Sequence, residues 1–119
     1  MSQERKVKRM GKVYDAIMAL VVGDALGVPV EFKARKSFFL TDMIGYGTHH
    51  QPAGTWSDDS DLTLATMKSI VRKGRIDLVD LMENFSKWLN KGDFTPYGEV
   101  FDVGGGCWRS CRDYLWFWW

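Results

Sequence analysis

The sequence predicts an all-α protein, and two observations lead to this prediction. Apolar residues recur at helical spacing in three stretches, residues 10–22, 62–71 and 78–89. Basic residues and a glycine, which commonly end helices, follow the last two stretches at 73–75 and 91–92. Of the 119 residues, 45% are hydrophobic, so the chain has material for the core of one domain or part of one.

The net charge, the apolar runs and the number of cysteines limit which partners and which cell location we expect. A net charge of +1 gives no reason to expect a nucleic-acid partner. No apolar run is expected to span a bilayer, and the polar, basic start lacks a signal-peptide core. The two cysteines, Cys107 and Cys111, are too few for a disulfide framework and fit a reducing compartment. We therefore expect a cytoplasmic protein with no membrane span.

The first predicted helix follows a basic extension, residues 1–9, which we interpret as solvated rather than as a nuclear signal or an anion contact. The helix begins near Met10 and ends near residues 23–27, and it is expected to be buried over residues 17–22. Asp24 and Glu31 then lie among apolar neighbours on either side of Pro29. Each is either exposed or held by a partner or a metal, because an unpaired buried carboxylate is costly.

Residues 33–54 are predicted to form a long loop before the second helix, punctuated by glycine and proline. Loops of this length are usually functional or disordered. His49 and His50 lie within it. Adjacent histidines without a second ligand pair are a weak metal signal, so we favour a loop role without a ligand function.

An acidic cluster, residues 57–61 (SDDSD), directly precedes the second predicted helix. Oxygen ligands suit a hard cation such as Mg²⁺ or Ca²⁺, and close carboxylates need neutralisation. The alternative is helix capping by Ser60 or Asp61, with the acids favoured by the helix dipole. Capping explains one or two of the five residues, so we favour a metal site.

The later helices are predicted to build the core. The helix over 62–71 has a broad apolar surface. Asp77 caps the next helix, whose apolar side chains form one stripe. The stripe comprises Leu78, Leu81, Met82, Phe85, Trp88 and Leu89. Residues 105–119 form an atypical aromatic tail that is either an interaction surface or an end not selected for this domain, and we favour the second interpretation.

Several common chemistries are excluded by the sequence. An EF-hand counted from Asp59 would have Leu64 where glycine is required and Ile70 where glutamate is expected. There is no Walker loop, G-x-G-x-x-G or G-x-S-x-G motif. The Asp59-Ser60-Asp61 triplet matches the short D-x-D pattern of nucleotide-sugar transferases, but without a strand-rich nucleotide-binding half. The scattered carboxylates, with Asp102 among them, instead favour metal-assisted hydrolysis.

Three motifs together resemble the opening of the ADP-ribosylglycohydrolase family. They are residues 23–32 (GDALGVPVEF), 54–60 (GTWSDDS) and 101–104 (FDVG), in the family's order and at compatible spacing. The resemblance implies a partial ADP-ribosylglycohydrolase-like domain over residues 10–104, all-helical, with a long loop before the metal-binding helix. It also implies hydrolysis of the glycosidic bond between ADP-ribose and an acceptor, either a modified protein or a small conjugate.

The same resemblance assigns roles to individual residues. Ser57, Asp58 and Asp59 match the N-terminal ligands of a site that holds two magnesium ions in the family. Glu31 and Asp102 are the expected catalytic carboxylates, and Gly104 is the expected substrate-binding position. These six residues, together with Asp24 as a structural group at the end of the first helix, form the predicted site.

The chain departs from the family after Gly104, where no aspartate-rich motif supplies the remaining metal ligands. We therefore expect a truncated protein that is inactive on its own. The alternative function is a non-catalytic helical binding module that associates through its aromatic C-terminus.

Overall fold

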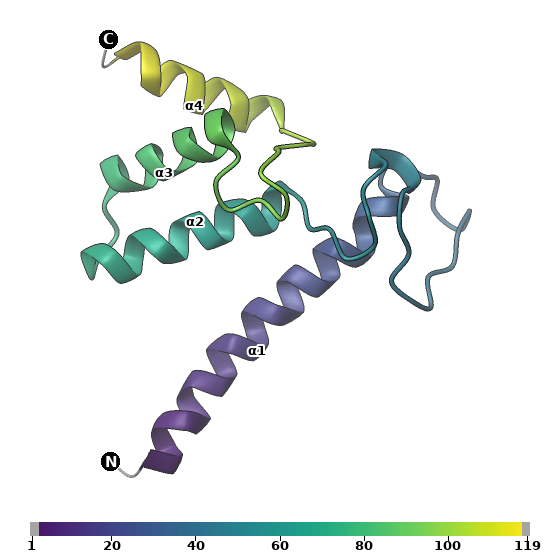
Figure 1. The fold of residues 1–119 in the computed structure, drawn as a ribbon, viewed down its shortest axis with the longest axis horizontal. Helices are drawn as coiled ribbons and strands as arrows, with labels where there is room; N and C mark the ends of the chain where they lie inside the picture. Colours follow the sequence, from purple (N-terminus) through teal and green to yellow (C-terminus); the bar gives the residue numbers. More distant parts are fainter. Residues whose placement is uncertain (1–2, 118–119) are drawn as a thin grey trace. The chain divides into compact units, whose positions relative to one another are not determined.

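In a computed structural model, the backbone of residues 3–117 and the side chains of residues 11–114 are described (Figure 1). This range is helical, contains no β-strand, and has one isolated β-bridge between Tyr46 and Gln51. The prediction of an all-α fold is confirmed. The chain divides at Gly54 into two compact units, each described below by itself.

The first unit is built on helix α1, Gln3–Gly27, which leads directly into the 3₁₀-helix η1, Val28–Val30. The backbone of α1 begins seven residues before the predicted start, inside the basic extension, whose side chains lie outside the described residues. Pro29 stands in the first turn of η1, where proline costs no hydrogen bond. The core of this unit lies at the junction, where Ala25, Val28 and Val30 are buried.

The expectation that α1 is buried over residues 17–22 is wrong within this unit. Met18, Leu20 and Val22 are 40–46% exposed. The physical reason is that the unit's packing is confined to the end of α1, where α1 contacts η1 and η1 contacts η2.

Residues 31–57 form the predicted long loop, which contains one further element, the 3₁₀-helix η2, Gly47–His49. η2 is anchored to η1, because the hydroxyl of Thr48 donates to the carbonyl oxygens of Glu31 and Pro29 at 2.7 and 3.3 Å. Gly47 has φ +54°, and a Cβ there would overlap the carbonyl of Pro29. The loop therefore returns to the end of α1 at a position that only glycine fits.

One apolar segment is longer than the sequence analysis expected. Residues Gly11–Val30 are helical, have a mean hydropathy of 1.6 and are long enough to cross a bilayer, and 22% of this apolar segment is buried. By length and composition, one helix therefore meets the criterion that no apolar run was expected to meet. Core helices of soluble proteins meet the same criterion, so the segment alone does not assign a membrane location.

The second unit contains α2, Asp58–Lys73, α3, Leu78–Lys91, and α4, Gly105–Phe117, with α3 packed against both α2 and α4 (Figure 1). The predicted ends of α2 and α3 are confirmed. Gly74 and Gly92 close the two helices in the left-handed conformation at φ +68° and +71°. The predicted cap of α3 is also confirmed, because the Asp80 N–H donates to Asp77 Oδ1 at 3.1 Å.

The interface between α2 and α3 contains more polar residues than we predicted from the apolar stripe of α3. Trp88 is fully buried, but Leu78 is 73% exposed. The buried positions of α3 also include Asp80 and Asn84, and Asn84 Nδ2 donates to the Ala65 carbonyl of α2 at 3.0 Å. The helices therefore meet through small and hydrogen-bonded side chains, which leaves part of the apolar stripe outside the interface.

One ion pair supports this interface near the turn between the two helices. Arg72 forms an ion pair with Asp80 across the turn that joins α2 and α3. The Ser69 hydroxyl and the Arg72 guanidinium lower the pKa of Asp80 from its ordinary value, although burial opposes them. The interface thus contains an aspartate that Arg72 holds through Oδ1. Among the described residues, Ser69 Oγ and Asp80 Oδ2 are buried without a hydrogen-bond partner.

The segment predicted as an atypical tail begins with α4, which packs on α3. Both cysteines are free thiols on this helix, and burial followed by the proximity of Cys107 raises the pKa of Cys111. The guanidinium of Arg112 lies over the Trp108 ring at 4.7 Å. The side chains of residues 115–119, on which the aromatic interaction hypothesis rests, lie outside the described residues.

Candidate active site

The predicted metal ligands lie at the N-terminus of α2, which begins at Asp58, four residues before the predicted start. Ser57 is the N-cap residue, so the capping alternative that named Ser60 or Asp61 is wrong. Ser57 is 1% exposed, Asp58 is half-buried and Asp59 is exposed. The first turn of the helix thus presents one hydroxyl and two carboxylates at increasing exposure.

Asp61 differs from the other acids of the cluster because its carboxylate supports the fold. Its Oδ1 accepts a hydrogen bond from Trp56 Nε1 and its Oδ2 accepts one from Trp88 Nε1, both at 2.8 Å. Asp61 is 2% exposed. Both carboxylate oxygens therefore satisfy indole N–H groups, and we assign Asp61 to the packing of α2 on α3 and not to the metal set.

Asp58 is the carboxylate whose charge the fold disfavours. Burial, then the charge of Asp59 and then that of Asp102, raise its pKa above the ordinary value of 3.8. Hydrogen bonds from the Ser57 hydroxyl and the Asp59 backbone N–H oppose the rise. The positive end of the helix dipole favours acids at this position, but the pKa is still raised. A cation beside Asp58 would relieve this cost.

Asp102 is brought close enough to influence Asp58 although 44 positions separate them in the sequence. Asp102 has φ +56°, a left-handed conformation that aspartate adopts more readily than most residues. Two positions later, Gly104 is exposed and its carbonyl accepts the Trp108 N–H at 2.9 Å at the start of α4. The 101–104 motif therefore links the acidic end of α2 to the following helix.

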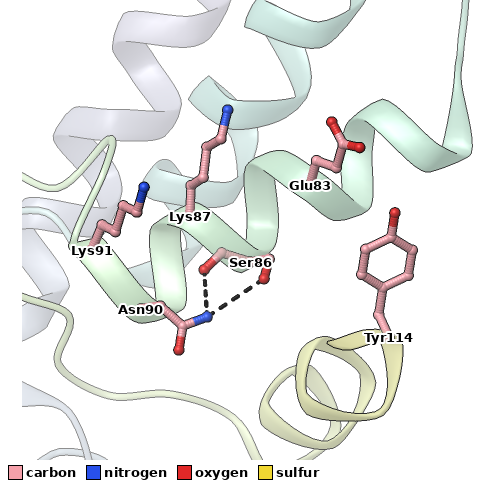
Figure 2. Close-up of a pocket in the computed structure, with 6 residues that line it drawn as sticks. All are labelled: Glu83, Ser86, Lys87, Asn90, Lys91 and Tyr114. Carbon is pink, nitrogen blue, oxygen red and sulfur yellow. Dashed lines mark hydrogen bonds between the residues drawn. The ribbon is translucent and has the colours of Figure 1, made fainter. Parts of the chain in front are cut away.

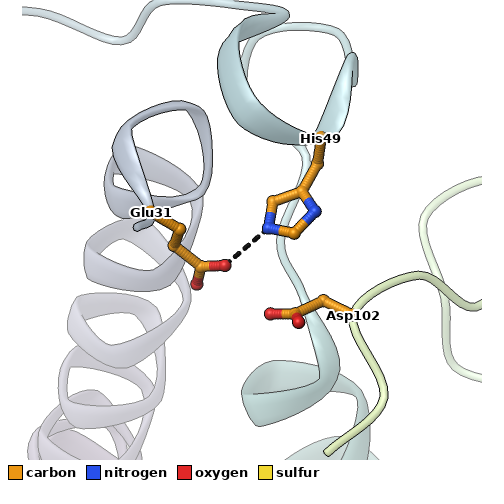
Figure 3. Close-up of side chains that lie close together, drawn as sticks. All are labelled: Glu31, His49 and Asp102. Atoms are coloured by element: carbon orange, nitrogen blue, oxygen red, sulfur yellow. Dashed lines mark hydrogen bonds and ion pairs between the residues drawn. The ribbon is translucent and has the colours of Figure 1, made fainter. Parts of the chain in front are cut away.

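Glu31 belongs to the first unit, where it has a partner that the sequence analysis did not foresee. Figure 3 shows the Glu31 carboxylate facing the ring of His49, and His49 Nε2 lies 2.6 Å from Glu31 Oε2. The Phe32 ring meets the His49 ring edge-on, with centroids 5.9 Å apart. The sequence signal was only a histidine pair in a loop, and hydrophobic periodicity cannot show that one of the two returns to Glu31.

A separate pocket of about 310 Å³ lies between α3 and α4 (Figure 2). It is lined by Glu83, Ser86, Lys87, Asn90, Lys91 and Tyr114. Burial, then the charges of Glu83 and Asp77, raise the pKa of Tyr114. None of the predicted site residues lines this pocket, so it does not contribute to the candidate site.

The donor chemistry of Ser57, Asp58 and Asp59 fits a hard divalent cation. All three side chains offer oxygen, the ligand atom that Mg²⁺ and Ca²⁺ prefer. Burial and, after it, the negative charges of Asp59 and Asp102 raise the pKa of Asp58 at this point. The arrangement is suited to binding a cation beside a further carboxylate, Asp102, which is the composition of a metal-assisted hydrolytic site.

Comparison with known proteins identifies relatives of the chain. The family model described as ADP-ribosylglycohydrolase matches residues 5–119. An ADP-ribosylarginine hydrolase of Serratia proteamaculans (strain 568) is 30% identical over 106 residues, which cover 89% of this chain and 29% of the relative. An ADP-ribosyl-(dinitrogen reductase) glycohydrolase of Rhodospirillum rubrum is 34% identical over 105 residues, covering 84% of this chain and 33% of the relative.

A third relative is likewise much longer than this chain. An ADP-ribosylarginine hydrolase of Pseudomonas putida (strain GB-1) is 29% identical over 100 residues, covering 84% of this chain and 27% of the relative. The chain thus spans about a third or less of the curated relatives it matches.

Proposed function

This chain belongs to the ADP-ribosylglycohydrolase family, and we propose that it contributes the N-terminal metal ligands of a site that hydrolyses the bond between ADP-ribose and an acceptor. The observation that carries the proposal is the acidic end of α2, where burial and the nearby charges of Asp59 and Asp102 raise the pKa of Asp58. The relatives' names describe hydrolysis of ADP-ribosylated arginine and dinitrogen reductase. An ADP-ribosylated protein is therefore the proposed substrate class.

Magnesium is the proposed cation. Ser57, Asp58 and Asp59 would hold it, and bound Mg²⁺ would supply charge stabilisation and substrate orientation. In our proposal, Asp102 orients the substrate or a water molecule as a nearby carboxylate, and Gly104 lets the substrate approach the backbone without a side chain. Glu31 is the proposed second catalytic carboxylate.

Magnesium titration of the 119-residue chain tests the metal site directly. We expect added Mg²⁺ to shift the backbone amide resonances of Ser57, Asp58 and Asp59, and the shifts to disappear in Asp58→Ala. Asp93→Ala is the matched control, because Asp93 is an exposed aspartate of the same unit outside the cluster. Equal responses in the two variants would contradict the proposal.

A chimera tests hydrolysis. This chain replaces the aligned N-terminal part of the Serratia ADP-ribosylarginine hydrolase, and release of ADP-ribose from ADP-ribosylarginine is measured. We expect Mg²⁺-dependent release that falls about 100-fold in Asp58→Ala and is unchanged in Asp93→Ala. Release that survives Asp58→Ala, or that is insensitive to a chelator, would exclude the metal role of α2.

A further inference from the structure

The contact between η1 and η2 fixes the backbone on both sides of the Glu31–His49 pair. The Thr48 hydroxyl donates to the carbonyl of Glu31 itself, 2.7 Å away, so the residue before His49 is hydrogen-bonded to the residue that His49 faces. Gly47 supplies the close approach to Pro29. The two side chains thus project from backbone segments that the Thr48 hydroxyl and the close approach of Gly47 hold together.

The side chains are also constrained. His49 Nε2 is 2.6 Å from Glu31 Oε2, with 14% and 30% of the respective side chains exposed. An ionised carboxylate only accepts hydrogen bonds, so Nε2 carries the proton in this contact. The Phe32 and His49 rings meet in a T-shaped arrangement with centroids 5.9 Å apart, and Gln51 Nε2 donates to the His49 carbonyl at 3.2 Å. The imidazole is therefore held by contacts on its ring and at its backbone.

We infer that His49 is a positioning residue for Glu31, fixing the carboxylate in one rotamer for the hydrolytic site. The inference rests on the proposed function, because it assigns His49 a role through Glu31 in that reaction. A glutamate has three side-chain torsions, and a half-exposed one without a fixed donor samples several rotamers. A pre-formed hydrogen bond removes that freedom before the substrate binds.

His50 provides an internal control. It is the chain's second histidine, it follows His49 directly, and it is exposed, with φ +52°. Spectra of the imidazole ring nitrogens therefore contain the signals of two rings, of which one belongs to the pair. Mutation of His50 perturbs the same loop without removing the donor to Glu31.

The first experiment tests the pair itself. Long-range ¹H–¹⁵N spectra of the ¹⁵N-labelled 119-residue chain are recorded for wild type and Glu31→Gln. We expect His49 to show a single Nε2–H tautomer, its Nε2 resonance to shift in Glu31→Gln, and the His50 resonances to stay in place. If the two histidines respond alike, or if His49 does not respond, the pair does not form and the inference is overturned.

The second experiment tests the role. The affinity of the full chain for ADP-ribose in the presence of Mg²⁺ is measured by calorimetry for His49→Leu, His49→Gln and His50→Leu. We expect about a 10-fold loss in His49→Leu, because outer-shell partners typically contribute 10- to 100-fold. His49→Gln should restore most of the affinity, since its amide can donate in place of Nε2, and His50→Leu should match wild type.

The outcomes separate this inference from the proposed function. A wild-type chain that binds ADP-ribose with Mg²⁺ but is insensitive to His49→Leu overturns the positioning role and leaves the proposed function intact. A loss that His49→Gln fails to restore indicates a structural role and also overturns it. A wild-type chain whose α2 resonances ignore Mg²⁺ and that binds no ADP-ribose overturns both.

Discussion

Asp61 and Glu31 are two carboxylates that accept hydrogen bonds from aromatic rings, but their surroundings differ. Asp61 uses both oxygens, one for each of two indole N–H groups, and is 2% exposed. Glu31 is paired through Oε2 with one imidazole, and 30% of its side chain is exposed. Asp61 is committed to the fold, whereas Glu31 is held in place with part of its surface accessible.

The difference shows that an acidic motif is not a uniform ligand set. Within residues 57–61, the buried Asp61 holds two tryptophans, while Asp58 and Asp59 remain available at the surface. Buried carboxylates need hydrogen-bond partners, and at Asp61 these partners occupy both oxygens inside the fold. Exposure and the number of hydrogen-bond donors therefore distinguish the acid that supports the fold from the acids that stay available for a cation, which the sequence alone does not do.

The largest expected effect is at Asp61. Asp61→Ala leaves the N–H of the fully buried Trp88, and that of Trp56, without their acceptor. We expect the free energy of unfolding to fall by about 3 kcal/mol, since hydrogen bonds to charged groups contribute about 1.5–3 kcal/mol each. Urea unfolding followed by circular dichroism measures the change.

Asp59→Ala is the matched control for that measurement. Asp59 is an exposed acid of the same helical turn, so its removal should change the free energy of unfolding by less than about 0.5 kcal/mol. Similar losses in the two variants would show that the structural and functional acids of the cluster are not distinct.

The next effect is at Gly47, beside the Glu31–His49 pair. Gly47→Ala forces a Cβ into the Pro29 carbonyl and adds the cost of φ +54°. Gly54→Ala has a comparable φ of +84° but no atom within 4 Å of the added Cβ. We expect Gly47→Ala to be less stable than Gly54→Ala by about 1–3 kcal/mol, the usual cost of overpacking.

Amide hydrogen exchange of residues 28–51 distinguishes the two glycine variants, because it reports on the first unit directly. We expect faster exchange at η1 and η2 in Gly47→Ala only. Equal protection in both variants would mean that the backbone approach of η2 to η1 does not hold the Glu31 region.

The smallest effect is at Asp58, where burial and neighbouring negative charges disfavour the ionised form and so raise the pKa. The protonated Asp58 side chain contributes to the free energy of unfolding below pH 3.8, and this contribution is lost as the pH rises through the raised pKa of the folded state. At neutral pH, Asp58→Asn should therefore raise the melting temperature slightly, and added Mg²⁺ should stabilise wild type but not the variant. Thermal melts between pH 3 and 7 measure this; a variant less stable than wild type at pH 7 would contradict the sign.

Much of the fold followed from the sequence, and the errors have physical causes. Helical periodicity and glycine C-caps located α2 and α3, and Asp77 was recognised as a cap because capping is local. The burial predictions failed at Leu78 because hydrophobicity does not reveal which face meets a neighbour. At the α2–α3 interface, hydrogen bonds from Asn84 and Trp88 decide the facing surface.

The candidate site was predictable only in part. The family motifs led to Asp58 and Asp102, and the structure shows their electrostatic coupling in the second unit. His49 was not found, because its contact with Glu31 spans 18 positions and depends on the path of an irregular loop. The predicted domain boundaries at residues 9 and 104 and the cytoplasmic location remain predictions.

The Asp61 carboxylate also has a consequence for the register of the helical hairpin formed by α2 and α3. Trp88 of α3 reaches Asp61 near the start of α2, and Asn84 reaches the Ala65 carbonyl one turn further along. Both bonds are donated by α3 to α2, and their positions advance along α2 while they go back along α3, as in an antiparallel pair. Sliding α3 by one helical turn therefore breaks both. In a slipped alignment, the buried Trp88 N–H and the Asp61 carboxylate would lose each other as hydrogen-bond partners. This cost favours the observed alignment of the two helices.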